Sequence, residues 1–154
     1  MLAWMKIFYK VLIIKKEVFA KIREYNFNVL YVEDNAQVQM HTLKMLDNFF
    51  PNIICAKDGN SGYDVYEKID NNINLIITDI QMPSCNGLEM IKRIRKQNLK
   101  IPIIIFSAYS NTDYLLDAIK CGIDGYIVKP YSLQHIYDTL VDLTTKLFNH
   151  KETF

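Results

Sequence analysis

The sequence predicts an α/β fold, a doubly wound parallel sheet of five strands with helices on both faces. From residue 27 onward, short β-branched runs alternate five times with longer amphipathic stretches. The short runs are almost continuously apolar, which is the pattern of parallel strands covered on both faces. All four prolines fall at junctions between segments, where proline is tolerated. Strict alternation with short connections favours a sheet built from strand–helix–strand units.

The predicted strands are runs of four to six mostly apolar residues, each with β-branched members: Phe27–Val32, Ile53–Ala56, Leu75–Thr78, Ile103–Ser107 and Gly125–Val128. The predicted helices lie after them at Ala36–Phe49, Ser61–Asn71, Gly87–Gln97, Asn111–Cys121 and Ser132–Phe148. A helix can start at Asp58–Gly59–Asn60, and Asn111 is a candidate cap for the fourth helix. The expected organisation is an N-terminal helical extension of residues 1–26, one domain of residues 27–148 and a tail of residues 149–154.

Length and composition restrict the function classes. With 154 residues, 50% of them hydrophobic, the chain can bury one core and is too short for two ordinary domains. A formal net charge of +1 gives no reason to expect direct nucleic-acid binding. The three cysteines are isolated and lack metal-ligand spacing, which argues against disulfides or a zinc site and favours a reducing, cytoplasmic location.

The first 26 residues differ in charge from the domain that follows. They contain six Lys or Arg and two Glu, whereas residues 27–148 contain eleven Lys or Arg and fourteen acidic residues. The apolar start Leu2–Ile14 is interrupted by Lys6 and Lys10, lacks a small-residue cleavage site and is too short to span a bilayer. We therefore expect neither a secretory signal nor a transmembrane helix.

At helical spacing this extension has a broad apolar face formed by Trp4, Ile7, Phe8, Val11, Ile14, Val18 and Ile22. Lys6, Lys10, Glu17 and Glu24 lie opposite, and Lys15 falls on the apolar side. Such a face needs a partner, which can be its own domain, a second copy of the chain or an anionic membrane surface. A segment that is partly disordered, or upstream of the true start, is the remaining interpretation. The preferred prediction is helical packing or a homodimer through this helix.

Polar residues with complementary chemistry follow four of the five strands. Glu33 and Asp34 follow the first, Asp79 follows the third, Ser107 ends the fourth and Lys129 follows the fifth. In an open parallel sheet these strand ends meet at the ligand-binding edge. Converging carboxylates repel one another unless a cation relieves the repulsion, and their oxygens suit Mg²⁺. An acidic pair alone would more often be a solvated turn, but the hydroxyl and the lysine complete an anion-binding arrangement.

Four sequence blocks carry a family resemblance: LYVEDN at Leu30–Asn35, DIQMP at Asp79–Pro83 with NGLE at Asn86–Glu89, SA at Ser107–Ala108, and GIDGYIVKP at Gly122–Pro130. In this order and spacing they resemble the receiver domain of two-component response regulators, over about Phe27 to Phe148. The resemblance implies a flavodoxin-like sheet of order 2-1-3-4-5. It also implies a single-domain, chemotaxis-type regulator, because only six residues follow Phe148 and we expect no attached DNA-binding or enzymatic domain.

The resemblance also assigns roles to residues. Asp79 is implied as the phosphoacceptor, and Glu33, Asp34, Asp79 and the backbone carbonyl of Gln81 as ligands of Mg²⁺. Ser107 and Lys129 are implied to contact the phosphoryl group, and Tyr126 is the implied switch aromatic, although a purely structural core role stays open for it. The Lys129–Pro130 bond is expected to be cis. Gln81 and Tyr109 occupy the positions that influence the lifetime of the phosphorylated form.

The predicted function is a receiver in a phosphorelay, and not an enzyme beyond assisting its own phosphorylation and dephosphorylation. The implied donor is a sensor histidine kinase or a phosphotransfer protein, and the output is an unknown downstream protein. A haloacid-dehalogenase-like phosphatase is disfavoured, because Gln81 stands where a carboxylate would serve as acid and base. A degenerate receiver is disfavoured because it would not keep every polar group. A flavodoxin-like cofactor binder would need a phosphate loop after the first strand, which the sequence lacks.

Overall fold

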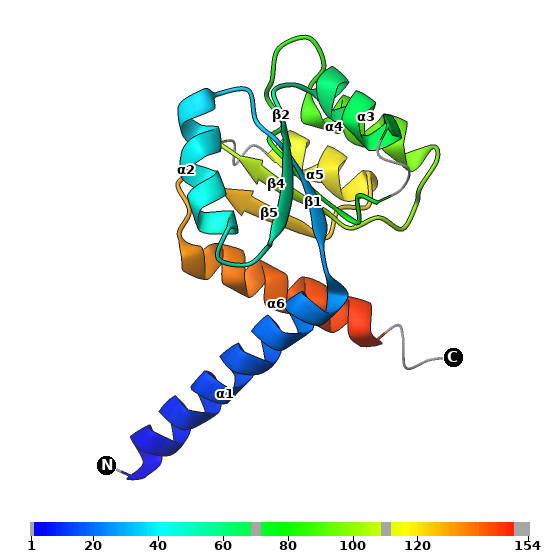
Figure 1. Ribbon diagram of the computed structural model, residues 1–154. Helices are drawn as coiled ribbons and strands as arrows, with labels where there is room; N and C mark the ends of the chain where they lie inside the picture. Colours follow the sequence, from blue (N-terminus) through cyan, green and yellow to red (C-terminus); the bar gives the residue numbers. More distant parts are fainter. Residues whose placement is uncertain (1, 69–71, 109–111, 150–154) are drawn as a thin grey trace.

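The computed structural model describes residues 2–68, 72–108 and 112–149. A long helix, α1 (Leu2–Tyr25), precedes a domain in which strands and helices alternate (Figure 1). The strands are β1 (Asn28–Val32), β2 (Asn52–Ala56), β3 (Leu75–Thr78), β4 (Ile103–Ser107) and β5 (Gly125–Val128). The helices between and after them are α2 (Ala36–Leu46), α3 (Gly59–Lys68), α4 (Gly87–Arg95), α5 (Thr112–Lys120) and α6 (Leu133–Asn149).

The five strands form one parallel sheet in the order β2-β1-β3-β4-β5, as predicted. Val32 at the end of β1 is in register with Ala56 of β2 and with Thr78 of β3. Ser107 at the end of β4 is in register with Val128 of β5. The carboxyl ends of all five strands therefore meet at one edge, and the residues that follow them are brought together.

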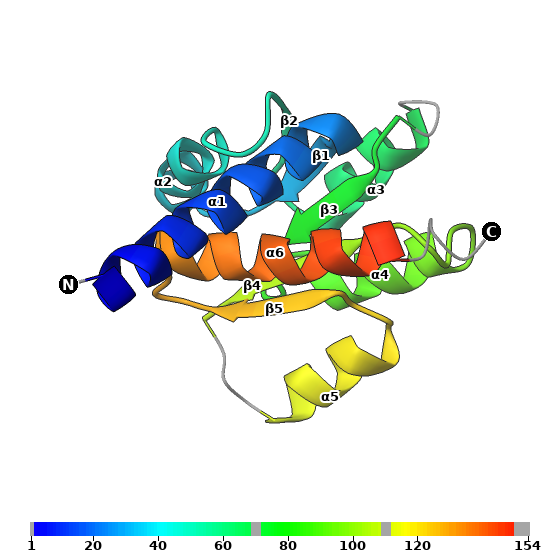
Figure 2. The ribbon, with the colours of Figure 1, turned by 90° about the horizontal axis from the view of Figure 1, so that it is seen from below.

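Helices cover both faces of the sheet (Figure 2). One core cluster joins inward residues of β1, β3 and β4 to α3, α4 and the single buried alanine of α5. The other joins the alternate residues of the same strands to α1, α2 and α6. Successive side chains of a strand point to opposite faces, so the two clusters are separated by the sheet itself. Among the helices of the described residues, none combines the length and apolarity that crossing a bilayer requires.

Strand β2 departs from the expectation that every strand is buried on both faces. Ile54 and Cys55 of this strand are exposed, and Ile54 keeps 37% of its surface accessible. Within the described part of the chain β2 pairs with β1 alone, so it is an edge strand of the sheet. The apolar run correctly predicted a strand but overestimated its burial.

Helix boundaries also differ from those expected by a few residues. α2 ends at Leu46 instead of Phe49, because Asp47 is its C-cap and the next two residues form a turn. α3 begins at Gly59, as the Asp58–Gly59–Asn60 sequence predicts, and Asp58 Oδ1 accepts a hydrogen bond from Ser61 N–H at 2.7 Å. The expected cap at Asn111 lies outside the described residues.

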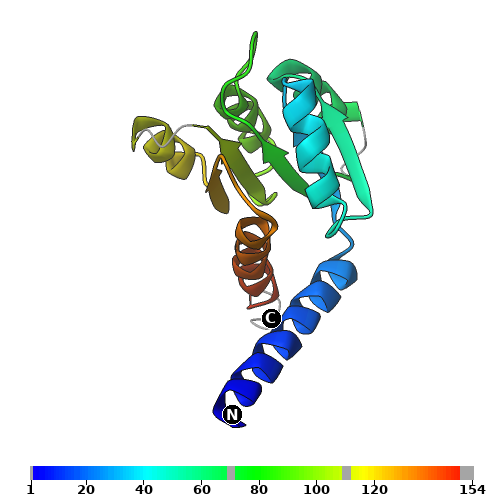
Figure 3. The same cartoon turned by 90° about the vertical axis from the view of Figure 1, so that its left-hand side faces the viewer.

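The second half of α1 packs against the domain. Val18 and Ile22 are buried, and the Phe19 ring stacks on Phe49 with their centroids 5.5 Å apart. Lys15, which interrupts the apolar face, has Nζ 5.5 Å from the centroid of the Tyr137 ring in α6. The helix ends where Asn26 adopts a positive φ of 51°, a conformation typical of helix ends. The first half extends beyond the domain (Figure 3).

Candidate functional site

Three carboxylates converge at the carboxyl edge of the sheet. Glu33 and Asp34 follow β1, and Asp79 follows β3. Sheet pairing continues one residue past the strands, because Asp79 N–H donates to Val32 O at 3.0 Å and Glu33 N–H donates to Ala56 O at 3.1 Å. Carboxylate oxygens of the three residues lie within 4.8 Å of one another. Glu33 and Asp79 are buried while Asp34 is exposed, so the cluster opens to solvent at Asp34.

Lys129 bridges the two buried carboxylates. Its Nζ lies 2.7 Å from Glu33 Oε2 and 2.9 Å from Asp79 Oδ2. Its backbone is held at the end of β4, because Lys129 N–H donates to Ser107 O at 2.7 Å. The Lys129–Pro130 bond is cis, as expected. The Lys129 side chain is only 17% exposed, which makes these charge-assisted hydrogen bonds stronger than surface ion pairs.

The pKa shifts reflect competition between burial and charge. Burial raises the pKa of Glu33, and the hydrogen bonds from Lys129 and from Asn35 N–H oppose that rise only in part. For Lys129, burial acts against the charged form, but its bonds to Glu33 and Asp79 outweigh burial and the pKa lies above its ordinary value. Lys129 therefore stays an ammonium at neutral pH.

The charge balance of the ionised site leaves room for a cation. Three carboxylates and one ammonium sum to −2 when all are ionised. The available donors are oxygen atoms, which are the ligands that Mg²⁺ prefers, and the exposed side of the cluster leaves space for water in its shell. The residues present thus fit a hard divalent cation.

Asp79 is held in a defined orientation. Its Oδ1 accepts hydrogen bonds from Ile80 N–H at 2.6 Å and from Gln81 N–H at 3.4 Å, while Oδ2 faces Lys129. The Thr78 hydroxyl donates to Asp79 O at 2.8 Å, and Gly87 N–H donates to Ile80 O at 2.8 Å. The loop after β3 is therefore anchored on both sides of the acid.

Of the remaining predicted residues, Ser107 and Gln81 lie beside the carboxylate cluster in the chain or the sheet, whereas Tyr126 lies farther along β5. Ser107 is buried at the end of β4, and its backbone carbonyl contacts Lys129. Gln81 follows Asp79 closely, with an exposed side chain. Tyr126 lies in the middle of β5, in register with Ile105, and packs half-buried against the core cluster on the α3–α5 side. Tyr109 lies outside the described residues.

Sequence reasoning missed several supporting residues. Asn35 caps α2 through Oδ1, which accepts from Gln37 N–H and Val38 N–H, and its own N–H binds Glu33 Oε1 at 3.1 Å. Gln39 Nε2 donates to both Glu33 O and Ala56 O at 3.1 Å and so ties the ends of β1 and β2 to α2. The cap was detectable, since Asn precedes an amphipathic stretch. The Gln39 contact had no local signal.

A second polar contact supports the turn that carries Lys129. The hydroxyls of Thr42 in α2 and Tyr131 share a hydrogen bond, and the Tyr131 ring packs against Phe106 with centroids 4.7 Å apart. Thr42 is fully buried, and burial raises the pKa of Tyr131, which therefore stays a neutral hydroxyl at neutral pH. This contact links α2, β4 and the residues after Pro130.

We expect Thr42→Val to lower the free energy of unfolding by about 1–3 kcal/mol, because it leaves the Tyr131 hydroxyl without its buried partner. Urea unfolding of both proteins measures the difference. Thr145→Val is the matched control, since Thr145 is an exposed helical threonine whose hydroxyl donates to Val141 O within its own helix. Equal losses in both variants would contradict a specific role for the Thr42–Tyr131 contact.

Gly87 allows α4 to begin directly behind Asp79. A Cβ added at this residue would lie 2.0 Å from Asp79 O, an impossible contact with backbone. We expect Gly87→Ala to displace the loop after β3 and to destabilise the domain by several kcal/mol, on the order of the larger overpacking effects. Thermal unfolding measures the loss. Gly122→Ala tests a different cause, because a Cβ there would make only an ordinary contact of 3.8 Å with Arg95 Nε, while the φ of Gly122 is +69°. A Gly87→Ala variant as stable as the wild type would contradict the close packing.

Comparisons with known proteins show the family of this chain. The family model described as the response regulator receiver domain matches residues 29–141. The chain belongs to the response regulator receiver family. It is 33% identical over 110 residues to the response regulator ArlR of Staphylococcus haemolyticus, a match that covers 71% of this chain and 49% of ArlR. It is 34% identical over 87 residues to the chemotaxis protein CheY1 of Helicobacter pylori, covering 54% and 70% of the two chains.

Solved receiver-like structures have the same fold. The N-terminal domain of an uncharacterised Wolinella succinogenes protein is 31% identical, with a TM-score of 0.71 and coverage of 81% of this chain and 98% of that one. The chain spans about half the length of ArlR and 22% of the regulatory protein AtoC of Escherichia coli. Receiver domains bind Mg²⁺ at an acidic pocket, and Glu33, Asp34 and Asp79 form such a cluster in this receiver.

Proposed function

We propose that this receiver accepts a phosphoryl group on Asp79 and signals through a changed protein-binding surface. The observation that carries the proposal is the position of Asp79, held between two backbone N–H groups and the Lys129 ammonium within an acidic cluster. This arrangement positions a carboxylate nucleophile and places a cation beside the oxygens on which charge develops.

The reaction transfers one phosphoryl group and turns over no metabolite. A carboxylate oxygen of Asp79 attacks phosphorus, an acyl-phosphate bond forms, and the phosphorus–nitrogen bond of a donor phosphohistidine breaks with its electron pair going to the imidazole nitrogen. Lys129 neutralises charge on the phosphoryl oxygens, and the N–H groups that now bind Asp79 keep its carboxylate oriented. Hydrolysis of the acyl phosphate returns the free carboxylate.

A Mg²⁺ ion fits the residues of this site. Glu33, Asp34 and Asp79, with the backbone carbonyl of Gln81, would hold it, and when bound it supplies positive charge to the transferring group. Glu33 has a second task, because it shares the Lys129 ammonium with Asp79 and so keeps the lysine in place.

The switch would run from the site to the α5–β5–α6 side of the domain. The Ser107 hydroxyl and Lys129 would bind the phosphoryl oxygens, and the half-buried Tyr126 of β5 would turn inward as the chain after β4 moves. Exposed apolar residues on this side, Leu116, Ile119 and Val128, are suited to a protein partner. The proposed partners are a sensor histidine kinase or phosphotransfer protein upstream and a separate protein downstream, without direct contact to nucleic acid.

Incubation with acetyl phosphate and Mg²⁺ tests the proposal, because a small acyl-phosphate donor replaces the kinase. Intact-mass analysis is expected to show one added phosphoryl group, and peptide mapping to place it on Asp79. Chelation of Mg²⁺ is expected to suppress the product. A mass gain that is unchanged without the cation, or that maps to another residue, would refute the assignment.

A further inference from the structure

The first half of α1 is exposed and apolar on more than one side. Trp4, Phe8 and Tyr9 keep 79%, 69% and 66% of their surface accessible. Met5, Ile7, Val11, Leu12, Ile13 and Ile14 are all exposed as well. One residue turns the helix by about 100°, so Tyr9 and Ile13, each two residues from Val11, lie nearly opposite to it. The apolar surface is therefore a wide arc and not a single stripe.

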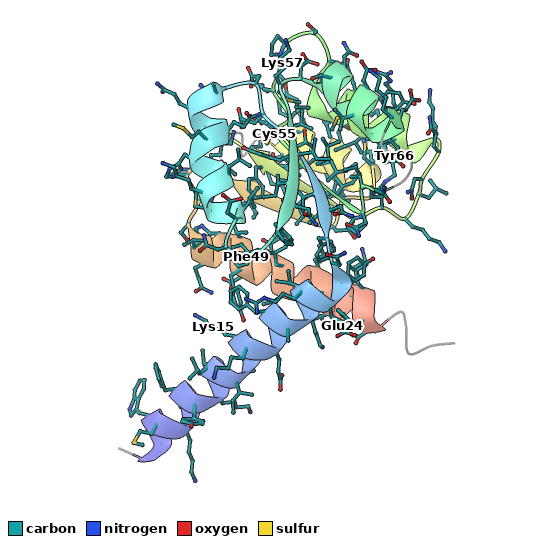
Figure 4. The ribbon with its side chains drawn as sticks, viewed as in Figure 1. Lys15, Glu24, Phe49, Cys55, Lys57 and Tyr66 are labelled. Atoms are coloured by element: carbon teal, nitrogen blue, oxygen red, sulfur yellow. The ribbon has the colours of Figure 1, made fainter. Side chains whose placement is uncertain are left out.

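The domain does not cover this part of the helix. Burial by the domain begins at Lys15 and Val18, where α1 contacts Tyr137 and Phe49 through Lys15 and Phe19. Figure 4 shows Lys15 near the point where α1 leaves the domain, and the side chains before it stand clear of the sheet and of α6. A contiguous apolar surface of this extent marks an interaction site.

The charges on the same segment are all positive. Residues 2–16 contain four lysines and no acidic residue, and the first carboxylate is that of Glu17. Lys6 and Lys10 are one helical turn apart, and Lys15 and Lys16 lie at the base of the free segment. Lysines beside an apolar arc extend their charged ends toward an anionic layer while their stems stay on the apolar surface.

These features disfavour a second copy of the chain as the partner. A two-helix seam through Trp4, Ile7, Val11 and Ile14 would leave Tyr9 and Ile13 exposed on the outer side, where paired helices carry polar residues. The seam could not continue along the helix, because Val18 and Ile22 are already buried against the domain. Each segment carries four lysines and no acidic residue. A pair of them would therefore bring eight lysines together, whose positive charges repel.

We propose that the free half of α1, residues 2–16, binds an anionic lipid membrane surface. The apolar arc would enter the boundary between headgroups and acyl chains, and the exposed Lys6, Lys10 and Lys16 would contact the lipid phosphates. The topology suits this use. Because α1 leads directly into the amino end of β1, it joins the sheet at the edge opposite to Asp79, and the phosphorylation site stays open to protein partners (Figure 1).

Trp4 makes the test direct, because it is the only tryptophan of the chain and lies within the proposed surface. The full chain is mixed with vesicles of phosphatidylcholine alone or with an equal part of phosphatidylglycerol. We expect a blue shift of Trp4 emission and co-sedimentation with the anionic vesicles only, both weakened by added salt. Lys6→Gln with Lys10→Gln is expected to weaken partitioning about 25-fold, from roughly fivefold for each lysine.

Matched variants distinguish binding through this surface from nonspecific adsorption to vesicles. Ile7→Ser with Phe8→Ser is expected to abolish vesicle binding, whereas Leu116→Ser with Ile119→Ser, an exposed apolar pair on α5, is expected to leave it unchanged. Lys92→Gln in α4 with Lys96→Gln at its C-cap is the control for charge, because both lysines are exposed and lie outside α1. Absence of binding to anionic vesicles would overturn the proposal. The proposal would also fail if light scattering gave the mass of a dimer and Trp4 emission were blue-shifted without vesicles. That result would assign the surface to a homodimer.

Discussion

Asp79→Asn is expected to abolish phosphorylation by acetyl phosphate and by a kinase alike. An amide is a poor nucleophile and forms no stable acyl phosphate, so the loss should be complete. The fold should survive, because the Asn side-chain oxygen can still accept from Ile80 N–H, the 2.6 Å bond that orients Asp79. Intact-mass analysis and a thermal unfolding curve of the same preparation measure both quantities.

The control for this substitution is Asp117→Asn. Asp117 lies in α5, its side chain is 51% exposed, and it pairs with Lys120 at 3.4 Å. It is therefore a carboxylate like Asp79, but it lies outside the acidic cluster. We expect this variant to gain one phosphoryl group at the wild-type rate. A mass gain that persists in Asp79→Asn would show that another residue is the acceptor, and the proposed function would then fail even if the fold were unchanged.

Lys129→Met is expected to slow phosphorylation roughly 100-fold, a typical loss when one preorganised charge is removed from a site of charge transfer. Met has a similar length and is apolar, so the β5–α6 turn should keep its packing. The same change leaves the carboxylates of Glu33 and Asp79 without their ammonium partner. Binding of Mg²⁺ should therefore be retained or become tighter, because Lys129 no longer offsets the negative charge.

Two measurements separate these effects. Phosphorylation rates at saturating Mg²⁺ report the role of Lys129 toward the phosphoryl group, and calorimetric titration reports Mg²⁺ affinity. Lys120→Met is the control, because the side chain of Lys120 is 75% exposed and its ion pair is a surface contact. A Lys129→Met variant that loses Mg²⁺ binding and phosphorylation together would contradict a direct role of Lys129 toward phosphate.

Much of the site could be predicted because it follows from strand order. Glu33, Asp79 and Lys129 each come directly after a predicted strand, and Asp34 follows Glu33. Parallel strands place such residues at one edge of the sheet. Their mutual distances needed the structure, as did the finding that one ammonium bridges Glu33 and Asp79. The hydrophobic period of a sequence does not determine side-chain rotamers. A position at a strand end therefore predicts which residues lie near one another, but not which atoms form hydrogen bonds.

The supporting contacts were less predictable. Gln39 and Thr42 occupy ordinary positions of an amphipathic helix, and only the packing of α2 against the sheet turns them toward β1, β2 and Tyr131. Strand β2 was predicted correctly as an element and wrongly as a buried one. The apolar composition of β2 can be read from its own residues. Its position at the edge of the sheet depends on how all five strands are ordered, which that composition does not show.

The sequence by itself determined the α/β class, the order of elements, the helical character of the N-terminal extension and the family. These depend on hydrophobic period, turn residues and motif spacing, which act over a few residues. Only the tertiary structure decided that one face of α1 is covered from Lys15 onward and that the helix is exposed before it. An apolar face on a helix indicates that its burial is favourable. Which surface buries it depends on the surfaces that lie within reach once the chain has folded.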